Sequence, residues 1–281
     1  MQYLINIRGK LVDLRKPRVM GILNATPDSF YEGSRVQTEH EIARRTNQII
    51  DEGGWAIDVG AYSTRPGAAD VTEAEETDRL RQALAIVRRE QPEAIVSVDT
   101  FRPAVARMAI EEFGADIIND VSGGNAQGAF GGEEASLGEG DNEMFRVVAR
   151  AHIPYIYMSR AKDIETMLLD FAQKTQLLHA LGQKDIILDP GFGFGKSLDD
   201  NYRILASLQE LQAAGHPLLV GLSRKSMIWR LLGSTPDDAL NGTTVLNTIA
   251  LQRGANILRV HDVRQAADAI TLCGRIEGLK I

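Results

Sequence analysis

Residues 185–197, DIILDPGFGFGKS, join a short apolar run to a glycine-rich loop that ends in lysine and serine. The composition suggests a phosphate-binding loop, but the spacing fits neither common type. A Walker loop ending at Ser197 would need glycine at position 190, where the chain has Pro190. A dinucleotide fingerprint starting at Gly191 would need glycine at position 196, where the chain has Lys196. We therefore interpret the stretch as a strand that ends at Asp189 and a tight turn that follows it.

Short apolar runs of this kind occur eight times along the chain. Each is rich in Ile, Val and Leu, which is typical of a strand buried on both faces of a parallel sheet. The runs are RVMGILN from Arg18, WAIDVG from Trp55, AIVSVDT from Ala94, DIINDV from Asp116, PYIYM from Pro154, DIILDPG from Asp185, PLLVGLS from Pro217 and NILRVHD from Asn256.

Segments with helical periodicity separate these runs. Thr72 and Glu75 predict a capping box at the start of one helix, and Pro103 suits the first turn of another. Two longer helices are predicted over residues 163–181 and 198–214.

The alternation of strands and helices predicts an α/β fold, a (β/α)₈ barrel, which typically takes about 250 residues. The alternative, a doubly wound sheet, would be expected to carry a G-x-G-x-x-G turn after an early strand, and the sequence has none. We interpret residues 1–281 as a single domain in which residues 1–16 form a β-hairpin that could close the barrel floor. Residues 127–142 are glycine-rich and acidic, and they predict a flexible insertion.

Composition narrows the class of protein further. The formal net charge of −7 argues against sequence-independent nucleic-acid binding, which needs a basic surface. The single cysteine, Cys273, excludes an internal disulfide and a cysteine-based zinc site, and it favours a reducing compartment. We find no signal-peptide core and no apolar run of membrane-spanning length. These features predict a cytoplasmic protein without a membrane partner.

Seven of the eight runs end in polar or ionisable residues, and barrels of this type have their active site at the C-terminal ends of the strands. The residues at these ends are Asn24, Asp58, Asp99, Asn119, Asp120, Asp189, Ser223 to Ser226, Arg259, His261 and Asp262. The fifth run ends at Met158, which we expect to form an apolar wall of the site.

The rim residues divide into two chemical groups. Asp99, Asn119 and Asp189 offer the acceptors and donors that a flat heterocycle with ring N–H, amino and carbonyl groups would need. The loops after the last two strands are the usual phosphate site of the fold. The cationic residues of the predicted rim are Lys225, Arg259, His261 and, from the loop after the second strand, Arg65. The predicted substrate therefore has a planar polar ring at one end and an anion at the other.

Other rim residues are expected to be structural. Asp58 and Asp120 are predicted to hydrogen-bond loop amides and to take no part in catalysis. Asp262 would either orient His261 or cap the next helix. Lys196 is not predicted to bind phosphate.

Seven blocks of sequence occur in the order found in one enzyme family. They are NATPDSF (24–30), STRPGA (63–68), SVDT (97–100), INDVSGG (118–124), DPGFGFGK (189–196), GLSRKS (221–226) and RVHDV (259–263). Together they resemble dihydropteroate synthase. The resemblance implies a folate-biosynthesis transferase that condenses 6-hydroxymethyl-7,8-dihydropterin diphosphate with 4-aminobenzoate, giving 7,8-dihydropteroate and diphosphate. It also implies a homodimer that uses Mg²⁺, binds only small-molecule substrates and is a target of sulfonamides.

The resemblance also implies roles for individual residues. Catalysis would depend on Asp99, Asp189, Lys225 and Arg259. The pterin would contact Asp99, Asn119, Met158, Asp189, Phe194 and Lys225, whereas the diphosphate would contact Arg65, Arg259 and His261. Aminobenzoate would contact Phe30, Thr64, Arg65, Pro66 and Ser226, and Asn24 would help to bind the metal.

The sequence departs from the family pattern at the end of the fifth strand, where Met158-Ser159-Arg160-Ala161 stands in place of the usual M-H-M-x-G. The first loop also reads SFYEGS where SFSDGG is usual. Two alternatives therefore stay open: a non-catalytic or divergent pterin-binding paralogue, and a pterin-dependent methyltransferase domain. The methyltransferase would have no need for the blocks at 63–68, 221–226 and 259–263.

Overall fold

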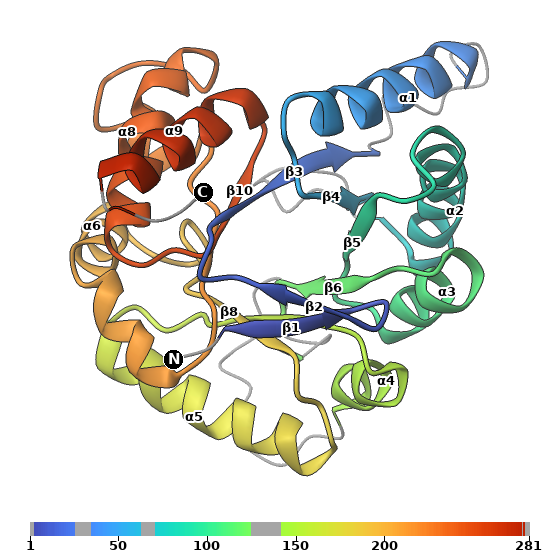
Figure 1. Ribbon diagram of the computed structural model, residues 1–281, viewed down its shortest axis with the longest axis horizontal. Coiled ribbons are helices and arrows are strands. Elements are labelled where there is room, and N and C mark those ends of the chain that lie inside the picture. The colour runs from blue at the N-terminus through green and yellow to red at the C-terminus, as the bar shows by residue number, and fades with distance from the viewer. Residues whose placement is uncertain (1–2, 26–34, 63–70, 125–141, 277, 279–281) are drawn as a thin grey trace.

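Figure 1 shows the computed structural model of the chain, which describes residues 3–25, 35–62, 71–124, 142–276 and 278. In the described residues, eight parallel strands form one sheet, and helices alternate with the strands and surround them. The strands in spatial order are β8 (Ile186–Asp189), β7 (Tyr155–Met158), β6 (Ile117–Asp120), β5 (Ile95–Asp99), β4 (Ala56–Gly60), β3 (Arg18–Asn24), β10 (Ile257–Val260) and β9 (Leu219–Val220). The predicted (β/α)₈ barrel is confirmed.

The barrel is nearly closed, and its seam lies between β8 and β9. The two strands share a single parallel bridge between Leu188 and Leu218, beside which the Leu188 N–H donates to the Pro217 carbonyl at 2.9 Å. Strand β9 is shorter than the run predicted from Pro217 because Asn256 replaces part of the ladder. The side-chain oxygen of Asn256 accepts from the Leu218 N–H at 2.8 Å, and its own N–H donates to the Leu218 carbonyl at 2.8 Å.

Two of the helices that cover the barrel, α2 (Glu73–Glu90) and α3 (Pro103–Phe113), begin where the sequence signals predict. The Thr72 side chain accepts from the Glu75 N–H and completes a capping box, and Pro103 occupies the first turn of its helix. The α-helices are α1 (Arg35–Asp51), α2 (Glu73–Glu90), α3 (Pro103–Phe113), α4 (Glu143–Ala151), α5 (Ile164–Ala180), α6 (Leu198–Ala206), α7 (Ser226–Trp229), α8 (Leu240–Gln252) and α9 (Val263–Ile276). A short 3₁₀ turn, Asp237–Ala239, precedes α8.

The single helix predicted over residues 198–214 is wrong, because α6 ends at Ala206 and a 3₁₀ helix continues from Leu208 to Ala214. In a continuous α-helix the Ala206 carbonyl would accept from the Glu210 N–H. Instead the Arg253 guanidinium donates to the Ala206 carbonyl, and Glu210 donates to the Ser207 carbonyl at 2.9 Å. A side chain distant in sequence thus takes the acceptor that the helix would have used.

The predicted N-terminal hairpin lies across the N-terminal end of the barrel (Figure 1). Its strands are β1 (Leu4–Ile7) and β2 (Lys10–Asp13), joined by a turn in which Arg8 and Gly9 both have positive φ. Arg8 donates to the buried Asp116 carboxylate at 2.6 and 2.8 Å, which fixes the turn to the barrel. The buried residues of this contact are Ile5, Ile7 and Leu14 of the hairpin segment and Met20, Ala56, Ile117, Ile156, Ile187, Leu219 and Ile257 of the barrel. The hairpin therefore closes the barrel floor with apolar side chains.

The predicted acidic insertion cannot be compared with the described residues. The acidic insertion, 127–142, lies outside them except for Asn142. Within the part of the chain that is described, no helix has the length and hydropathy needed to span a membrane.

Candidate active site

Alternation along the strands places the polar residues of the rim inside the barrel. The layer that contacts the hairpin includes Ala56 of β4 and Ile257 of β10, whereas Ile57 and Leu258 pack outward under the helices. Since side chains on a strand alternate between its two faces, the residue two positions after each floor residue also faces the interior. This second interior layer contains Ile22, Asp58, Ser97, Asn119, Met158, Asp189 and Arg259.

Hydrogen bonds across the interior join three of these residues and Asp99, which come from four different strands. Arg259 donates through Nε to Asp58 Oδ2 at 2.6 Å and through Nη2 to Asp99 Oδ2 at 2.6 Å. Asn119 Nδ2 donates to the same Asp58 Oδ2 at 3.1 Å. The structure therefore brings together Asp99, Asn119 and Arg259, three predicted site residues, and adds Asp58 to them.

The prediction that Asp58 bonds loop amides is wrong. Its carboxylate is fully buried in the second interior layer and contacts two side chains of the candidate site. The predicted bonds of Asp120 to loop amides are confirmed, because its carboxylate accepts from the Ser122 and Gly124 amides at 2.7 and 2.9 Å. Asp120 faces outward, where it also accepts from the Tyr155 hydroxyl at 2.7 Å.

Burial sets the electrostatics of this interior cluster. It raises the pKa of the Asp99 carboxyl, which the neighbouring Arg259 guanidinium partly offsets. Burial also disfavours the charged form of Arg259, but Asp58 and Asp99 together raise its pKa above the usual value. The guanidinium is therefore a permanent positive charge held between two carboxylates.

The glycine-rich loop after β8 places Asp189 against Met158 and Lys225. Asp189 Oδ1 accepts from the Gly191 N–H at 2.7 Å, which turns the chain immediately after the strand. Gly191 has φ +64°, and a Cβ there would lie 2.5 Å from the Ser159 carbonyl oxygen and 3.0 Å from Met158 Cγ. Only glycine fits this close approach.

Lys225 reaches the same loop from the chain segment after β9. Its ammonium donates to the Phe192 carbonyl and lies 4.8 Å from the centroid of the Phe194 ring. Burial lowers the pKa of Lys225 to about 8, and the Asp189 carboxylate opposes this effect. A Cβ at Gly193 would lie 3.1 Å from Lys225 Cδ, so the bare backbone there leaves room for the lysine side chain.

Lys196 has a structural contact in this loop. Its ammonium donates to the Ser159 and Gly191 carbonyls at 3.2 and 3.0 Å, and burial lowers its pKa to about 8. These bonds tie the end of β7 to the loop after β8. The unusual Ser159 therefore contributes its backbone carbonyl to the site's framework, an interaction that its side chain does not determine.

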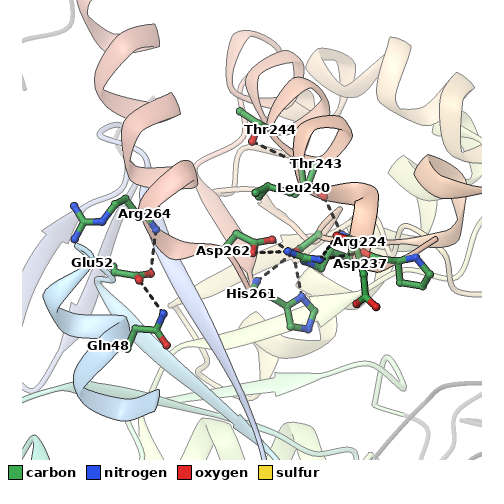
Figure 2. Close-up of polar contacts among 12 residues, drawn as sticks. Gln48, Glu52, Arg224, Asp237, Leu240, Thr243, Thr244, His261, Asp262 and Arg264 are labelled. Atoms are coloured by element: carbon green, nitrogen blue, oxygen red, sulfur yellow. Dashed lines mark hydrogen bonds and ion pairs between the residues drawn. The ribbon is translucent and has the colours of Figure 1, made fainter. Parts of the chain in front are cut away.

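The loops after β9 and β10 are joined by two adjacent contacts (Figure 2). Ser223 Oγ lies 3.0 Å from His261 Nδ1 and accepts from the His261 N–H at 3.1 Å. Arg224 donates twice to the Asp262 carboxylate, both at 2.9 Å. The Asp262 carboxylate is thus paired with Arg224, a partner that neither sequence alternative for it named.

Arg224 also holds the turn before α8. Its Nη1 donates to the Pro236 and Asp237 carbonyls at 3.1 and 2.9 Å, and its N–H donates to Thr243 Oγ1 at 3.0 Å. Figure 2 shows the guanidinium between Asp262 and Asp237. The next residues in the chain are Lys225 and Ser226, so Arg224 positions two predicted site residues. As expected, Ser226 begins a helix, α7.

The remaining predicted site residues are Asn24 and four residues of the loops after β3 and β4. Asn24 is exposed at the end of β3, on the interior-facing register of Met20 and Ile22. The predicted aminobenzoate and anion residues Phe30, Thr64, Arg65 and Pro66 lie outside the described residues.

A comparison with known proteins identifies the family. A model of the pterin-binding enzymes matches residues 20–261. Dihydropteroate synthase of Escherichia coli K12 is 37% identical over 278 aligned residues, which cover 94% of this chain and 93% of the relative. The chain belongs to the dihydropteroate synthases, within the pterin-binding enzyme family.

Solved dihydropteroate synthases also share the fold. The structure from Xanthomonas albilineans with 4-aminobenzoic acid matches with a TM-score of 0.84 at 33% identity, covering 100% of both chains. The one from Anaplasma phagocytophilum with bound 6-hydroxymethylpterin-monophosphate has a TM-score of 0.81 at 29% identity, covering 93% of this chain and 99% of the other. The resemblance to dihydropteroate synthase, inferred from seven sequence blocks, is confirmed.

Proposed function

We propose that this dihydropteroate synthase transfers the pterin-methyl group of 6-hydroxymethyl-7,8-dihydropterin diphosphate to 4-aminobenzoate in folate biosynthesis. The observation that supports it best is the interior layer in which carboxylates, an amide and cations from five strands meet. The solved relatives with 6-hydroxymethylpterin-monophosphate and 4-aminobenzoic acid support the same substrates.

The pterin ring would lie on the interior layer. Asp99, Asn119 and Asp189 would pair with its ring N–H, amino and carbonyl groups, because carboxylates and amides supply the complementary acceptors and donors. Met158, which is buried, and Phe194, which is half-buried, would contact its faces. Lys225 lies between Asp189 and Phe194, where it would donate to a ring carbonyl or nitrogen.

The chemical step would need charge stabilisation and no protein nucleophile. The bond between the pterin methylene carbon and the diphosphate oxygen breaks, and its electron pair leaves with the diphosphate. The resulting pterin-stabilised cation is then attacked by the amine of 4-aminobenzoate, which afterwards loses a proton. Arg259 and His261 would hold the departing diphosphate, whereas Asp99 and Asp189 would stabilise the cation electrostatically.

The aminobenzoate carboxylate would accept hydrogen bonds at the start of α7, where Ser226 offers a hydroxyl and a backbone N–H. Phe30, Thr64, Arg65 and Pro66 are proposed to complete this subsite. Sulfonamides, which resemble aminobenzoate, would compete for it.

Mg²⁺ is the proposed cofactor, and Asn24 is its proposed protein ligand. The described residues contain no group of three His, Cys, Asp or Glu side chains that would hold a metal by themselves. One exposed amide oxygen at the barrel mouth nevertheless fits this ion, because Mg²⁺ commonly takes one or two protein ligands beside substrate phosphates and water. When bound, it would neutralise charge on the leaving diphosphate.

The proposed homodimer would pair through α8 and α9, which pack side by side on one flank of the barrel (Figure 1). Exposed apolar side chains there include Val245 on α8 and Leu272 and Ile276 on α9, which are 49%, 66% and 79% exposed. Contiguous apolar patches on a protein surface commonly mark protein–protein interfaces. We also propose a cytoplasmic location, which the single cysteine supports.

The decisive test is a coupled assay for diphosphate release with the pterin diphosphate, Mg²⁺ and 4-aminobenzoate, omitting each component in turn. Release that needs both substrates and yields dihydropteroate is the expected result. Tight pterin binding without product would instead favour the non-catalytic paralogue.

A further inference from the structure

Asp58 is a buried carboxylate in the candidate site for which the reaction described above has no use. It is 0% exposed and lies in the second interior layer, directly under the barrel mouth. One of its oxygens, Oδ2, accepts from both Arg259 Nε and Asn119 Nδ2. A buried carboxylate is costly unless it is paired and hydrogen-bonded, and these two partners offset that cost at Oδ2. The other oxygen, Oδ1, has no hydrogen-bond partner among the described residues.

The bond to Asn119 decides which end of that amide faces the barrel interior. A carboxylate oxygen only accepts hydrogen bonds, so the atom of Asn119 that faces Asp58 must be the NH₂ group. The other end, Asn119 Oδ1, is then an acceptor. Among the residues that the structure describes, this buried oxygen has no hydrogen-bond partner. Buried polar atoms nearly always have a hydrogen-bond partner, so we expect a bound ligand to supply the donor for Oδ1.

The bond to Arg259 fixes the position of the arginine side chain. Asp58 holds Nε at the root of the guanidinium, whereas Asp99 holds Nη2 near its tip. A ligand donor that engages Asp99 would release Nη2, but the Asp58 bond would keep the arginine in place. Arg259 could then turn its tip toward an anion without leaving the barrel mouth.

We infer that Asp58 is a positioning residue that orients the Asn119 amide as an acceptor for a ring N–H of the pterin and anchors Arg259 for the diphosphate. This inference rests on the proposed function, because it names the same ligands. It goes beyond it by assigning the positioning of groups for both halves of one substrate to a single buried carboxylate.

Two substitutions at position 58 separate the effect of Asp58 on Asn119 from its effect on Arg259. Asp58→Ala removes the acceptor from both partners. Asp58→Asn keeps an acceptor oxygen of similar volume for Asn119 but removes the charge that pairs with Arg259. Thr175→Ala is the control, because Thr175 is also buried but lies on α5, where its hydroxyl donates to the Phe171 carbonyl at 2.7 Å, outside the candidate site.

The readout is calorimetric binding of 6-hydroxymethyl-7,8-dihydropterin and, separately, of its diphosphate with Mg²⁺. Asp58→Ala should weaken binding of the phosphate-free pterin about tenfold, the equivalent of one hydrogen bond. Asp58→Asn should change that affinity less than about threefold, yet lose about tenfold of the additional affinity that the diphosphate confers. Thr175→Ala should stay within about twofold of wild type for both ligands.

A double-mutant cycle tests whether Asp58 acts through Asn119. In an Asn119→Ala background, Asp58→Ala should change pterin affinity less than about twofold, because the amide that it orients is gone. An equal loss in both backgrounds, or wild-type affinity in Asp58→Ala, would overturn the inference. If Asp58→Ala does not fold by circular dichroism, the diphosphate result with Asp58→Asn decides it. A wild-type protein that binds neither ligand would refute the proposed function instead.

Discussion

Replacing Arg224 by alanine should loosen the loop that carries Lys225 and Ser226 while leaving the barrel folded. The Arg224 guanidinium makes two hydrogen bonds to the Asp262 carboxylate and two to backbone carbonyls of the turn before α8. Without it, the loops after β9 and β10 would keep the contact between Ser223 and His261 but lose both bonds to Asp262. The aminobenzoate end of the proposed site, at Ser226, should therefore suffer most.

The size of the effect follows from burial. The side chains of Arg224 and Asp262 are 26% and 17% exposed, so the pair is neither at the surface nor in the core. Exposed ion pairs contribute about 0–1 kcal/mol, and breaking a buried pair costs about 3–5 kcal/mol. We expect Arg224→Ala to lower the free energy of unfolding by about 2–3 kcal/mol, between these limits. The KM for 4-aminobenzoate should rise about tenfold, the equivalent of one lost hydrogen bond.

Urea unfolding and steady-state kinetics measure both quantities. Arg81→Ala is the matched control, because Arg81 also donates twice to one carboxylate, Glu112, at 2.8 and 2.7 Å. That pair lies between α2 and α3 with side chains 45% and 44% exposed, so its loss should cost no more than about 1 kcal/mol and leave KM unchanged. Equal effects of the two substitutions on stability, or an unchanged KM for aminobenzoate in Arg224→Ala, would refute the reasoning.

Three further predictions follow from the same contacts. Since burial lowers the pKa of Lys225 to about 8, its positive charge is lost as pH rises through that value, and kcat/KM for the pterin diphosphate should fall about tenfold per pH unit above it; a profile that is flat to about pH 9.5 would contradict either the lowered pKa or the need for the charge. If the proposed dimer pairs through α8 and α9, Leu272→Glu on the exposed apolar face of α9 should convert it to monomers in light scattering at unchanged circular dichroism, and a variant that stays dimeric would place the interface elsewhere. Asp120→Asn should lower the free energy of unfolding by about 2–3 kcal/mol in urea, because it weakens bonds to two loop amides and the Tyr155 hydroxyl; a loss below about 0.5 kcal/mol would contradict the structural role.

The barrel itself could be predicted from sequence because its signals are local and repeated. Eight apolar runs, each buried on both faces, leave little choice but a parallel sheet covered by helices. The capping box at Thr72 and the hairpin turn at Arg8 and Gly9 also depend only on neighbours in the chain.

The errors arise where a distant side chain competes for a backbone group. Arg253 takes the Ala206 carbonyl and ends α6 early, and Asn256 replaces strand partners of Leu218 and shortens β9. Neither arginine nor asparagine at these positions carries a local signal. Their effect depends on the packing of helices and strands that are far apart in the chain.

The candidate site shows the same limit. Position at a strand end was enough to select Asp99, Asn119, Asp189 and Arg259 as candidates. It could not show that Asp58 joins two of them, because its partners lie on β6 and β10, two strands away on either side. For Asp262, likewise, the helix that it precedes was visible in the sequence, but its partner Arg224 was not.

Register is what connects the apolar floor to the polar mouth. Ala56 packs against the hairpin, and Asp58, two residues further along β4, faces the same interior, whereas Ile57 between them packs under the helices. A slip of one residue in β4 would turn Ile57 inward and drive the Asp58 carboxylate into the apolar layer beneath the helices. The cost of burying that unpaired charge is several kcal/mol, so the polar residues of the site themselves help to select the register of the strand.

The packing of β3 against α1 adds a second constraint, because a Cβ at Gly21 would lie 2.5 Å from Ile49 Cγ2 and only glycine allows the helix to pack so closely. The same alternation of side chains therefore specifies both the fold and the site. A substitution that disturbs the apolar floor should also lower the activity of the candidate site at the barrel mouth.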